Sequence, residues 1–171
     1  MDDRIFAKPQ DQIVDFAFSE DVVGVFPDMI RRSVPGYELV IPMGGLIAAR
    51  HMGTSGTAFD LGCSLGASSL ALLAQCESPS VRLIAVDNSA AMVEQARHNI
   101  DDARVSFRCE DLLATDVSGA RVVMLNFALQ FLPTQARAQL LGTIAASMDP
   151  SGLLILSEKV QDEDARQQRF Y

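Results

Sequence analysis

The residues best suited to chemistry follow short apolar runs. The first group, Asp60–Gly66, reads DLGCSLG. Its glycines allow a tight turn in which a ligand touches the backbone, and the following helix N-terminus would offer N–H groups to a carboxylate or phosphate. The spacing G-x-S-x-G is not the G-x-G-x-x-G of dinucleotide sites, which makes a nicotinamide enzyme the least favoured function. An ordinary glycine turn between a strand and a helix is the plain alternative.

A second group, Asp87-Asn88, ends the next β-rich run, 21 residues after Gly66. An acidic residue at this place can accept hydrogen bonds from both ribose hydroxyls of an adenosine. The alternative is that Asp87 only caps the helix that begins near Ser89. The two groups together favour a ligand site more strongly than either one alone.

Two further groups, Glu110-Asp111 and Asn126-Phe127, end later β-rich runs. The Asp111 carboxylate is placed to accept the exocyclic amine of adenine, unless this is only a solvated acidic turn. Asn126 is expected to face the reacting end of the ligand, although a buried amide also serves purely structural hydrogen bonds. All of these places are predicted carboxyl ends of parallel strands, where open α/β sheets bind ligands.

Other candidates carry weaker signals. More often structural than functional are Arg31-Arg32, Cys63, His51 and His98. No residue near Cys63 in the sequence is placed to activate its thiol. The Tyr37 hydroxyl is equally suited to a ligand carboxylate and to packing.

The elements that must position these residues alternate along the chain. Strands are predicted at 57–61, 81–86, 104–108, 121–125 and 153–156, and helices at 67–76, 90–100 and 133–148. This alternation predicts an α/β domain with a parallel sheet and helices on both faces. Upstream, we expect a helix starting at Ser19-Glu20-Asp21 that Pro27 kinks or divides, and a helix over 37–51 weakened by Pro42 and two glycines. We therefore expect a helical cap over 1–52 and a Rossmann-like domain over 53–171.

Composition excludes several function classes. The 171 residues carry 14 Lys and Arg against 22 Asp and Glu, a formal net charge of −8, which argues against direct contact with a nucleic-acid backbone. No apolar run approaches the roughly 20 residues that span a bilayer, and we expect neither a membrane protein nor a secreted one. The three cysteines form no CxxC or Cys/His cluster, so we expect no metal site and free thiols in the cytoplasm.

The pairing of Asp60–Gly66 with Asp87 resembles the class I methyltransferases that use S-adenosylmethionine (SAM). The segments Phe26–Tyr37, Asn126–Leu132 and Leu156–Lys159 are more specific and resemble the carboxy-SAM synthases, and the resemblance extends from Asp15 to Ala165. It implies conversion of SAM and prephenate into carboxy-SAM and phenylpyruvate, for oxyacetyl modification of the wobble uridine of tRNA. A partner enzyme would then act on the tRNA, which agrees with the acidic charge of this chain.

The resemblance also implies which residues bind SAM or carboxy-SAM. These are Tyr37, Gly62, Cys63, Ser64, Asp87, Asn88, Asp111, Leu112 and Asn126. Gly62–Ser64 would form the wall at the amino-acid end and Asp87 would hold the ribose, with Asn88 beside it. Asp111 and the Leu112 backbone would contact the adenine. No catalytic residue is identified.

The chain departs from the family in three ways. Family members continue past Tyr171, into the last two strands of the sheet and an arginine that pairs with the added carboxylate of carboxy-SAM. The position near Phe16 is usually Trp, and 161–171 reads as the opening of a helix. We therefore expect a C-terminally truncated chain with low or no synthase activity, and a homodimer through the exposed edge at 153–156. The alternatives are a SAM-dependent methyltransferase acting on a small molecule and a non-catalytic SAM-binding fragment.

Overall fold

The computed structural model describes residues 20–160, so the expectations for Ser19, Phe16 and 161–171 lie outside the described residues. Five strands form one sheet in the order β3-β2-β1-β4-β5, with every neighbouring pair parallel. The strands are β1 Gly56–Leu61, β2 Val81–Asp87, β3 Val105–Cys109, β4 Val122–Asn126 and β5 Leu153–Ser157. Each predicted strand is present, with ends that differ by one residue at most.

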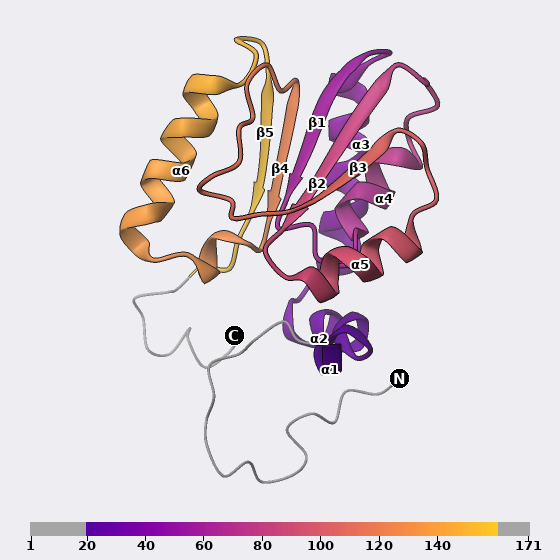
Figure 1. Cartoon of the computed structure of the whole chain (residues 1–171), viewed down its shortest axis with the longest axis vertical. Helices are drawn as coiled ribbons and strands as arrows, with labels where there is room; N and C mark the ends of the chain where they lie inside the picture. The colour runs from indigo at the N-terminus through magenta and orange to yellow at the C-terminus, as the bar shows by residue number, and fades with distance from the viewer. Residues whose placement is uncertain (1–19, 161–171) are drawn as a thin grey trace, which may run out of the picture.

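Helices cover both faces of the sheet, as expected. They are α1 Glu20–Val23, α2 Phe26–Ser33, α3 Tyr37–Met52, α4 Ala67–Leu73, α5 Ala90–Asn99 and α6 Thr134–Ser147, with a 3₁₀ turn, η1, at Leu129–Phe131. Figure 1 shows α3, α4 and α5 on one face and α6 on the other. Pro27 lies in the first turn of α2, where a missing N–H costs nothing, and the chain is divided there into α1 and α2.

Alternation along the central strands builds a core on each face of the sheet. Val122 and Met124 pack with the α3 residues Ala48 and Met52, all of them buried. Val123 and Leu125 instead share a cluster with Leu140 and Ile144 of α6. Successive strand residues point to opposite faces, so the unbroken apolar run of β4 is what a strand buried on both sides requires.

The helix predicted over 37–51 is present as α3, which ends one residue later than expected. Pro42 lies inside it, yet the helix runs unbroken to Met52. Gly45 is where α3 and α4 meet, because a Cβ there would stand 2.4 Å from the carbonyl carbon of Ala71. The glycines that weaken helix propensity thus permit close helix packing. Because α3 shares a core cluster with the strands, we use the word cap for α1 and α2 alone, and the boundary at residue 52 stays a prediction.

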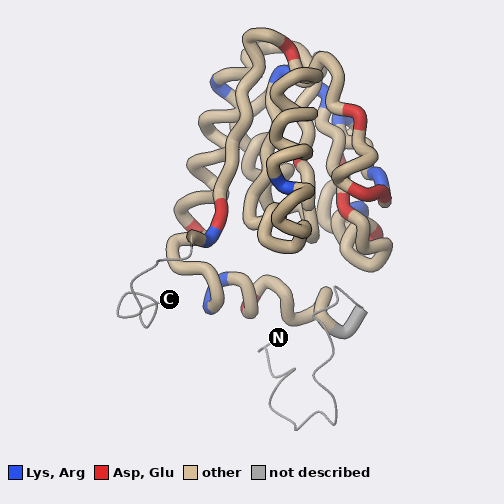
Figure 2. The backbone as a smooth tube through the Cα atoms, turned by 90° about the vertical axis from the view of Figure 1, so that its left-hand side faces the viewer, with Lys and Arg blue, Asp and Glu red and all other residues tan. Residues whose placement is uncertain are grey.

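The cap lies at one end of the sheet. Figures 1 and 2 show α1 and α2 as a layer beyond the carboxyl ends of the strands, with α2 lying across that end. Val22 and Phe26 of the cap pack with Met92 of α5, which joins the layer to the sheet domain. No helix within residues 20–160 has both the length and the apolar character needed to cross a membrane.

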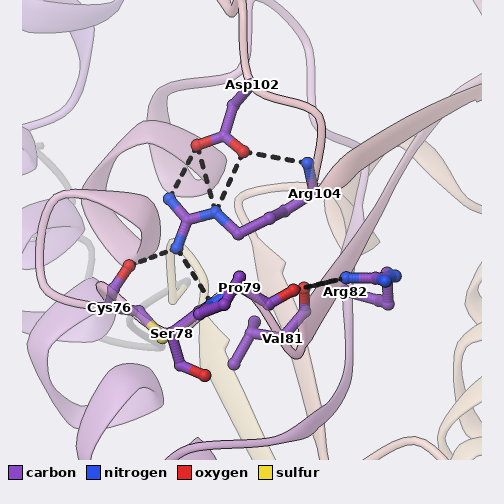
Figure 3. Close-up of polar contacts among 7 residues, drawn as sticks. All are labelled: Cys76, Ser78, Pro79, Val81, Arg82, Asp102 and Arg104. Carbon is purple, nitrogen blue, oxygen red and sulfur yellow. Dashed lines mark hydrogen bonds and ion pairs between the residues drawn. The ribbon is translucent and has the colours of Figure 1, made fainter.

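The opposite, amino end of the sheet is fastened by polar contacts. Arg104 precedes β3 and forms an ion pair with Asp102, with 2.6 Å between Nη2 and Oδ2. The same guanidinium donates to the carbonyl oxygens of Cys76 and Ser78 in the loop between α4 and β2 (Figure 3). These contacts tie the two loops that lead into β2 and β3.

Candidate functional site

A cavity of about 970 Å³ lies where the carboxyl ends of the strands meet α2 and the start of α3. All nine residues proposed from the resemblance line it. They are Tyr37, Gly62, Cys63, Ser64, Asp87, Asn88, Asp111, Leu112 and Asn126. They come from five separate segments of the chain, which the fold brings together at the carboxyl end of the sheet. Cavities of this size suit drug-sized ligands.

Asp87 ends β2 and fastens two loops of the cavity wall. Its Oδ2 accepts the backbone N–H of Ser64 at 2.9 Å, and its Oδ1 accepts the backbone N–H of Ser89 at 2.9 Å. Burial raises the pKa of this carboxyl, while the hydrogen bonds from Ser89 and Ser64 lower it. Asp87 therefore does hold the start of α5 through Ser89, as the alternative interpretation predicted. This contact uses only part of the hydrogen-bonding capacity of the carboxylate. A carboxylate has about four acceptor sites, so the backbone N–H groups of Ser89, Ser64 and Asn88 leave acceptor capacity for a hydroxyl of a ligand.

The glycine loop is shaped by close contact as well as by φ. Gly62 has φ +77°, and a Cβ there would lie 2.7 Å from the Cβ of Ala128. The N–H groups of Gly62 and Cys63 both donate to the carbonyl of Val86, and the N–H of Ser64 donates to Asp87. These three amides are therefore already used within the protein. The loop presents a close backbone surface to a ligand rather than a row of free donors.

Asp60, within the motif but absent from the proposed set, is a buried acid behind the cavity wall. It is 1% exposed and accepts the hydroxyl of Ser69 at 2.6 Å. Burial raises its pKa to about 6, against the opposing effect of hydrogen bonds from the Ser69 hydroxyl and backbone N–H. The start of α4 was expected to offer free N–H groups to an anionic ligand. That expectation was wrong in part, because the protein's own Asp60 takes the N–H of Ser69.

Asp111 and Leu112 follow β3 at the edge of the sheet. The Asp111 Oδ1 accepts the backbone N–H of Leu113 at 2.8 Å, which closes a tight turn. Leu112 is buried in the core cluster beneath. Asp111 itself is exposed, so its carboxylate serves the acidic turn and also borders the cavity.

Asn126, at the end of β4, holds an unsatisfied acceptor. Its Nδ2 donates to the Ser68 hydroxyl at 3.0 Å. Its Oδ1 is buried and has no hydrogen-bond partner within the described residues. Structural hydrogen bonding therefore satisfies the Nδ2 donor of Asn126 but not its Oδ1 acceptor. Buried acceptors are nearly always satisfied in proteins, and Asn126 is one of the residues that line the cavity, so its amide is a candidate for contact with a ligand.

Tyr37 is half-buried against Phe127, with ring centroids 5.9 Å apart. Burial raises the pKa of its hydroxyl, so it stays protonated and can donate a hydrogen bond. Phe127 has a positive φ of 57°, unusual for a residue other than glycine. Its N–H donates to the carbonyl of Ser157 at 2.7 Å, which holds the bend in place.

The weaker candidates are largely structural. Burial raises the pKa of the Cys63 thiol, which keeps it protonated and unreactive. His51 lies in the last turn of α3 and contacts the carbonyl of Ser151, and His98 is exposed on α5. Arg31 lines the cavity and pairs with Glu38 at 3.1 Å. Within residues 20–160, no group of three His, Cys, Asp or Glu side chains could hold a metal ion.

Sequence reasoning missed two residues after β5. Glu158 accepts the backbone N–H of Leu129 at 2.6 Å and so holds the turn that follows β4. Lys159 lines the cavity. Both belong to the segment Leu156–Lys159, which resembles the carboxy-SAM synthases but for which the sequence analysis predicts no role in the site.

Comparisons with known proteins agree with this geometry. A methyltransferase domain family matches residues 58–152. The carboxy-S-adenosyl-L-methionine synthase of Trichlorobacter lovleyi is 45% identical over 99% of this chain and 71% of its own length. The synthase of Pseudomonas fluorescens is 47% identical over 96% of this chain and 70% of its own.

Solved structures show the same fold. A methyltransferase structure from Methanococcus maripaludis, assigned to the SAM-dependent class, aligns with a TM-score of 0.63 at 23% identity. It covers 85% of this chain and 66% of that one. The SAM-bound amino pentose methyltransferase of Micromonospora echinaspora gives 0.63 at 21% identity, over 89% and 61%. The chain therefore has the class I methyltransferase fold and belongs to the carboxy-S-adenosyl-L-methionine synthase family of transferases that use SAM.

Proposed function

We propose that this chain binds SAM in the cavity and converts it, with prephenate, into carboxy-SAM and phenylpyruvate. The observation that carries the proposal is that Asp87 and Asn126 line the same cavity, and that the buried Oδ1 of Asn126 has no hydrogen-bond partner among residues 20–160. The likeness to named carboxy-SAM synthases over nearly the whole chain supports the same reaction.

The order of the strands matches the order of the parts of SAM. Across the sheet the ends of β3, β2, β1 and β4 carry Asp111, Asp87, Gly62 and Asn126 in turn. We assign adenine to Asp111 and the Leu112 backbone, and the ribose diol to the free acceptor sites of Asp87. The amino-acid end lies along Gly62–Ser64, bordered by Asn126 and Tyr37.

The electrostatics of the wall suit a cationic ligand. SAM carries a positively charged sulfonium, which makes the protons of its methyl group acidic. The acidic side chains Asp60 and Asp87 lie behind and beside the glycine loop, and each favours positive charge when ionised. The Asn126 Oδ1 can accept a hydrogen bond from the ammonium of the ligand, which would satisfy its missing partner.

The second substrate is a small molecule, for which we propose prephenate. Its conversion to phenylpyruvate breaks a bond to one carboxyl group and the bond to the ring hydroxyl. The carboxyl carbon joins the methyl carbon of SAM, and the displaced methyl proton leaves with the hydroxyl as water. The apolar side chains of Phe127, Phe131 and Leu132 line the cavity and suit a six-membered ring. The product would serve wobble-uridine modification by a partner enzyme.

Mass spectrometry of two samples tests this function. The ligand released from purified, denatured protein should be SAM or a species heavier by one carbon dioxide. Incubation with SAM and prephenate should release phenylpyruvate above the protein-free rate. The low or absent synthase activity expected from the sequence stays a prediction, and the rate of phenylpyruvate release tests it. Methylation of a small acceptor without phenylpyruvate would support the methyltransferase alternative. Bound SAM with no turnover of any acceptor would support the fragment.

We also propose that the chain forms a homodimer. The support is apolar surface within the described residues: Leu156 of β5 is 44% exposed, and Leu39 of α3 is 68% exposed. Light scattering during size-exclusion chromatography should give twice the monomer mass, and a monomer mass at micromolar concentration would contradict it. The expected cytoplasmic location also stays a prediction.

A further inference from the structure

We propose that Lys159 binds a carboxylate of the second substrate and so selects a carboxylate donor over neutral molecules. This inference rests on the proposed function and extends it to a residue outside the predicted set. Lys159 stands two residues after β5, on the side of the cavity away from the adenosine groups, and it lines the cavity wall.

The first argument is the charge of the cavity. Its lining includes the acidic residues Asp87 and Asp111, which oppose the entry of an anion. Only two cationic side chains, Arg31 and Lys159, line it within residues 20–160. Arg31 is already paired with Glu38 at 3.1 Å. For Lys159 the described residues provide no hydrogen bond or ion pair, so its ammonium is available to a ligand.

The second argument is position along the sheet. The adenosine groups are assigned to the ends of β3 and β2, and the amino-acid end to β1 and β4. The next strand end in the order β3-β2-β1-β4-β5 is that of β5, which carries Lys159. The methyl group is bonded to the sulfonium, between the ribose and the amino-acid end, so a second substrate that approaches it from the side away from the adenine lies over β4 and β5 (Figure 1). Phe127 and Phe131, which also line the cavity, follow β4 at this place.

The third argument is the fixed backbone before Lys159. Its neighbour Glu158 accepts the N–H of Leu129 at 2.6 Å, and Ser157 accepts the N–H of Phe127 at 2.7 Å. These contacts join the end of β5 to the turn after β4. Lys159 therefore leaves an anchored segment and not a free loop, which lowers the cost of ordering its long side chain on a ligand. Glu158 acts here as a positioning residue.

The test separates binding of the two substrates. Titration calorimetry gives the Kd of SAM, and then the Kd of prephenate for protein saturated with S-adenosylhomocysteine, which cannot react. We expect Lys159→Gln to leave the Kd of SAM within about twofold and to weaken prephenate by about ten- to a hundredfold, as loss of a charged hydrogen bond predicts. Lys159→Arg should recover part of the loss. Arg50→Gln, which removes the same charge from an exposed site outside the cavity, should change neither value.

Each result decides a different claim. Unchanged prephenate affinity in Lys159→Gln overturns the role of Lys159 and leaves the proposed function intact. An equal loss in Arg50→Gln also overturns it, because a general charge effect would then explain the result. If the unaltered protein binds SAM but not prephenate, the proposed substrate and the role of Lys159 both fall. If it does not bind SAM, the proposed function itself is wrong.

Discussion

The two ends of the sheet differ in whether their polar side chains have partners within the protein. At the amino end, Asp102 is matched to Arg104, and the side-chain hydrogen bond from Arg104 holds the pKa of Asp102 below its usual value. At the carboxyl end, burial raises the pKa of Asp60 and Asp87, and the Asn126 acceptor has no partner within the described residues. Both ends are made of loops between the same strands, so topology alone does not explain the difference. The polar groups at the amino end have partners within the protein, and we propose that a ligand completes those at the carboxyl end.

Backbone conformation differs in the same sense. The two residues other than glycine with positive φ in the described chain, Ser64 and Phe127, both lie at the carboxyl end. Each is held by a hydrogen bond from its own N–H, to Asp87 and to Ser157 respectively. Strained conformations that surrounding contacts enforce tend to gather at functional sites.

The largest expected effect is on the free energy of unfolding, and it compares one glycine at each end of the sheet. Gly62→Ala adds a left-handed conformation penalty of about 1–2 kcal/mol and a clash with Ala128 that costs roughly another 1–3 kcal/mol. Gly119→Ala is the matched control, because Gly119 has a similar φ of +70° but open space around its Cβ. Urea unfolding should show a larger loss for Gly62→Ala. Equal losses in the two variants would mean that the contact with Ala128 is unimportant.

The next effect is a pH dependence of opposite sign at the two ends. Burial raises the pKa of Asp60 in the folded protein to about 6, above the 3.8 of an unperturbed aspartate. Its contribution is therefore present below pH 3.8 and lost as pH rises through 6, by up to about 3 kcal/mol. Asp102 has a lowered pKa, so its contribution is present above the unfolded pKa and lost in acid.

Urea unfolding at several pH values checks both signs. Between pH 4 and pH 7, Asp60→Asn should remove much of the fall in unfolding free energy that the unaltered protein shows. Asp102→Asn should leave this interval unchanged and flatten the profile only at lower pH. A fall of the same size in Asp60→Asn would show that Asp60 is not the titrating group.

The smallest effect is at the amino end. Arg104→Gln removes the ion pair with Asp102 and the bonds to two carbonyl groups (Figure 3). Since the groups are partly exposed, we expect a loss of only about 1 kcal/mol in unfolding free energy. The Kd of SAM should not change. A tenfold weaker Kd would show that the two ends are coupled, against the comparison drawn above.

Sequence patterns predicted the strands well because a strand buried on both faces leaves an unbroken apolar run, as in Val122–Leu125. The helix over 37–51 was also predicted to within one residue, but the sequence did not show why Gly45 stands inside it, which is the close contact with Ala71. That contact joins residues far apart in the chain and leaves no local signal. The cap boundary at residue 52 stays a prediction.

The candidate site was predicted in part. Asp87 and Asn126 were found because they end strands, and a parallel sheet brings strand ends together. The occupation of the loop amides was not foreseen, because it depends on where the carbonyl of Val86 and the carboxylate of Asp60 point. Lys159 was passed over because a single lysine after a strand resembles any solvated residue until its neighbours are known.

The central claim is that the carboxyl end of the sheet binds SAM through Asp87, and one calorimetric comparison tests it most directly. SAM is titrated into the unaltered protein, into Asp87→Asn and into Asp102→Asn, each checked for folding by circular dichroism. The account predicts a Kd about ten to a hundred times weaker in Asp87→Asn, from the loss of charged hydrogen bonds worth roughly 1.5–3 kcal/mol, and no change in Asp102→Asn. Equal SAM affinity in all three proteins would contradict it.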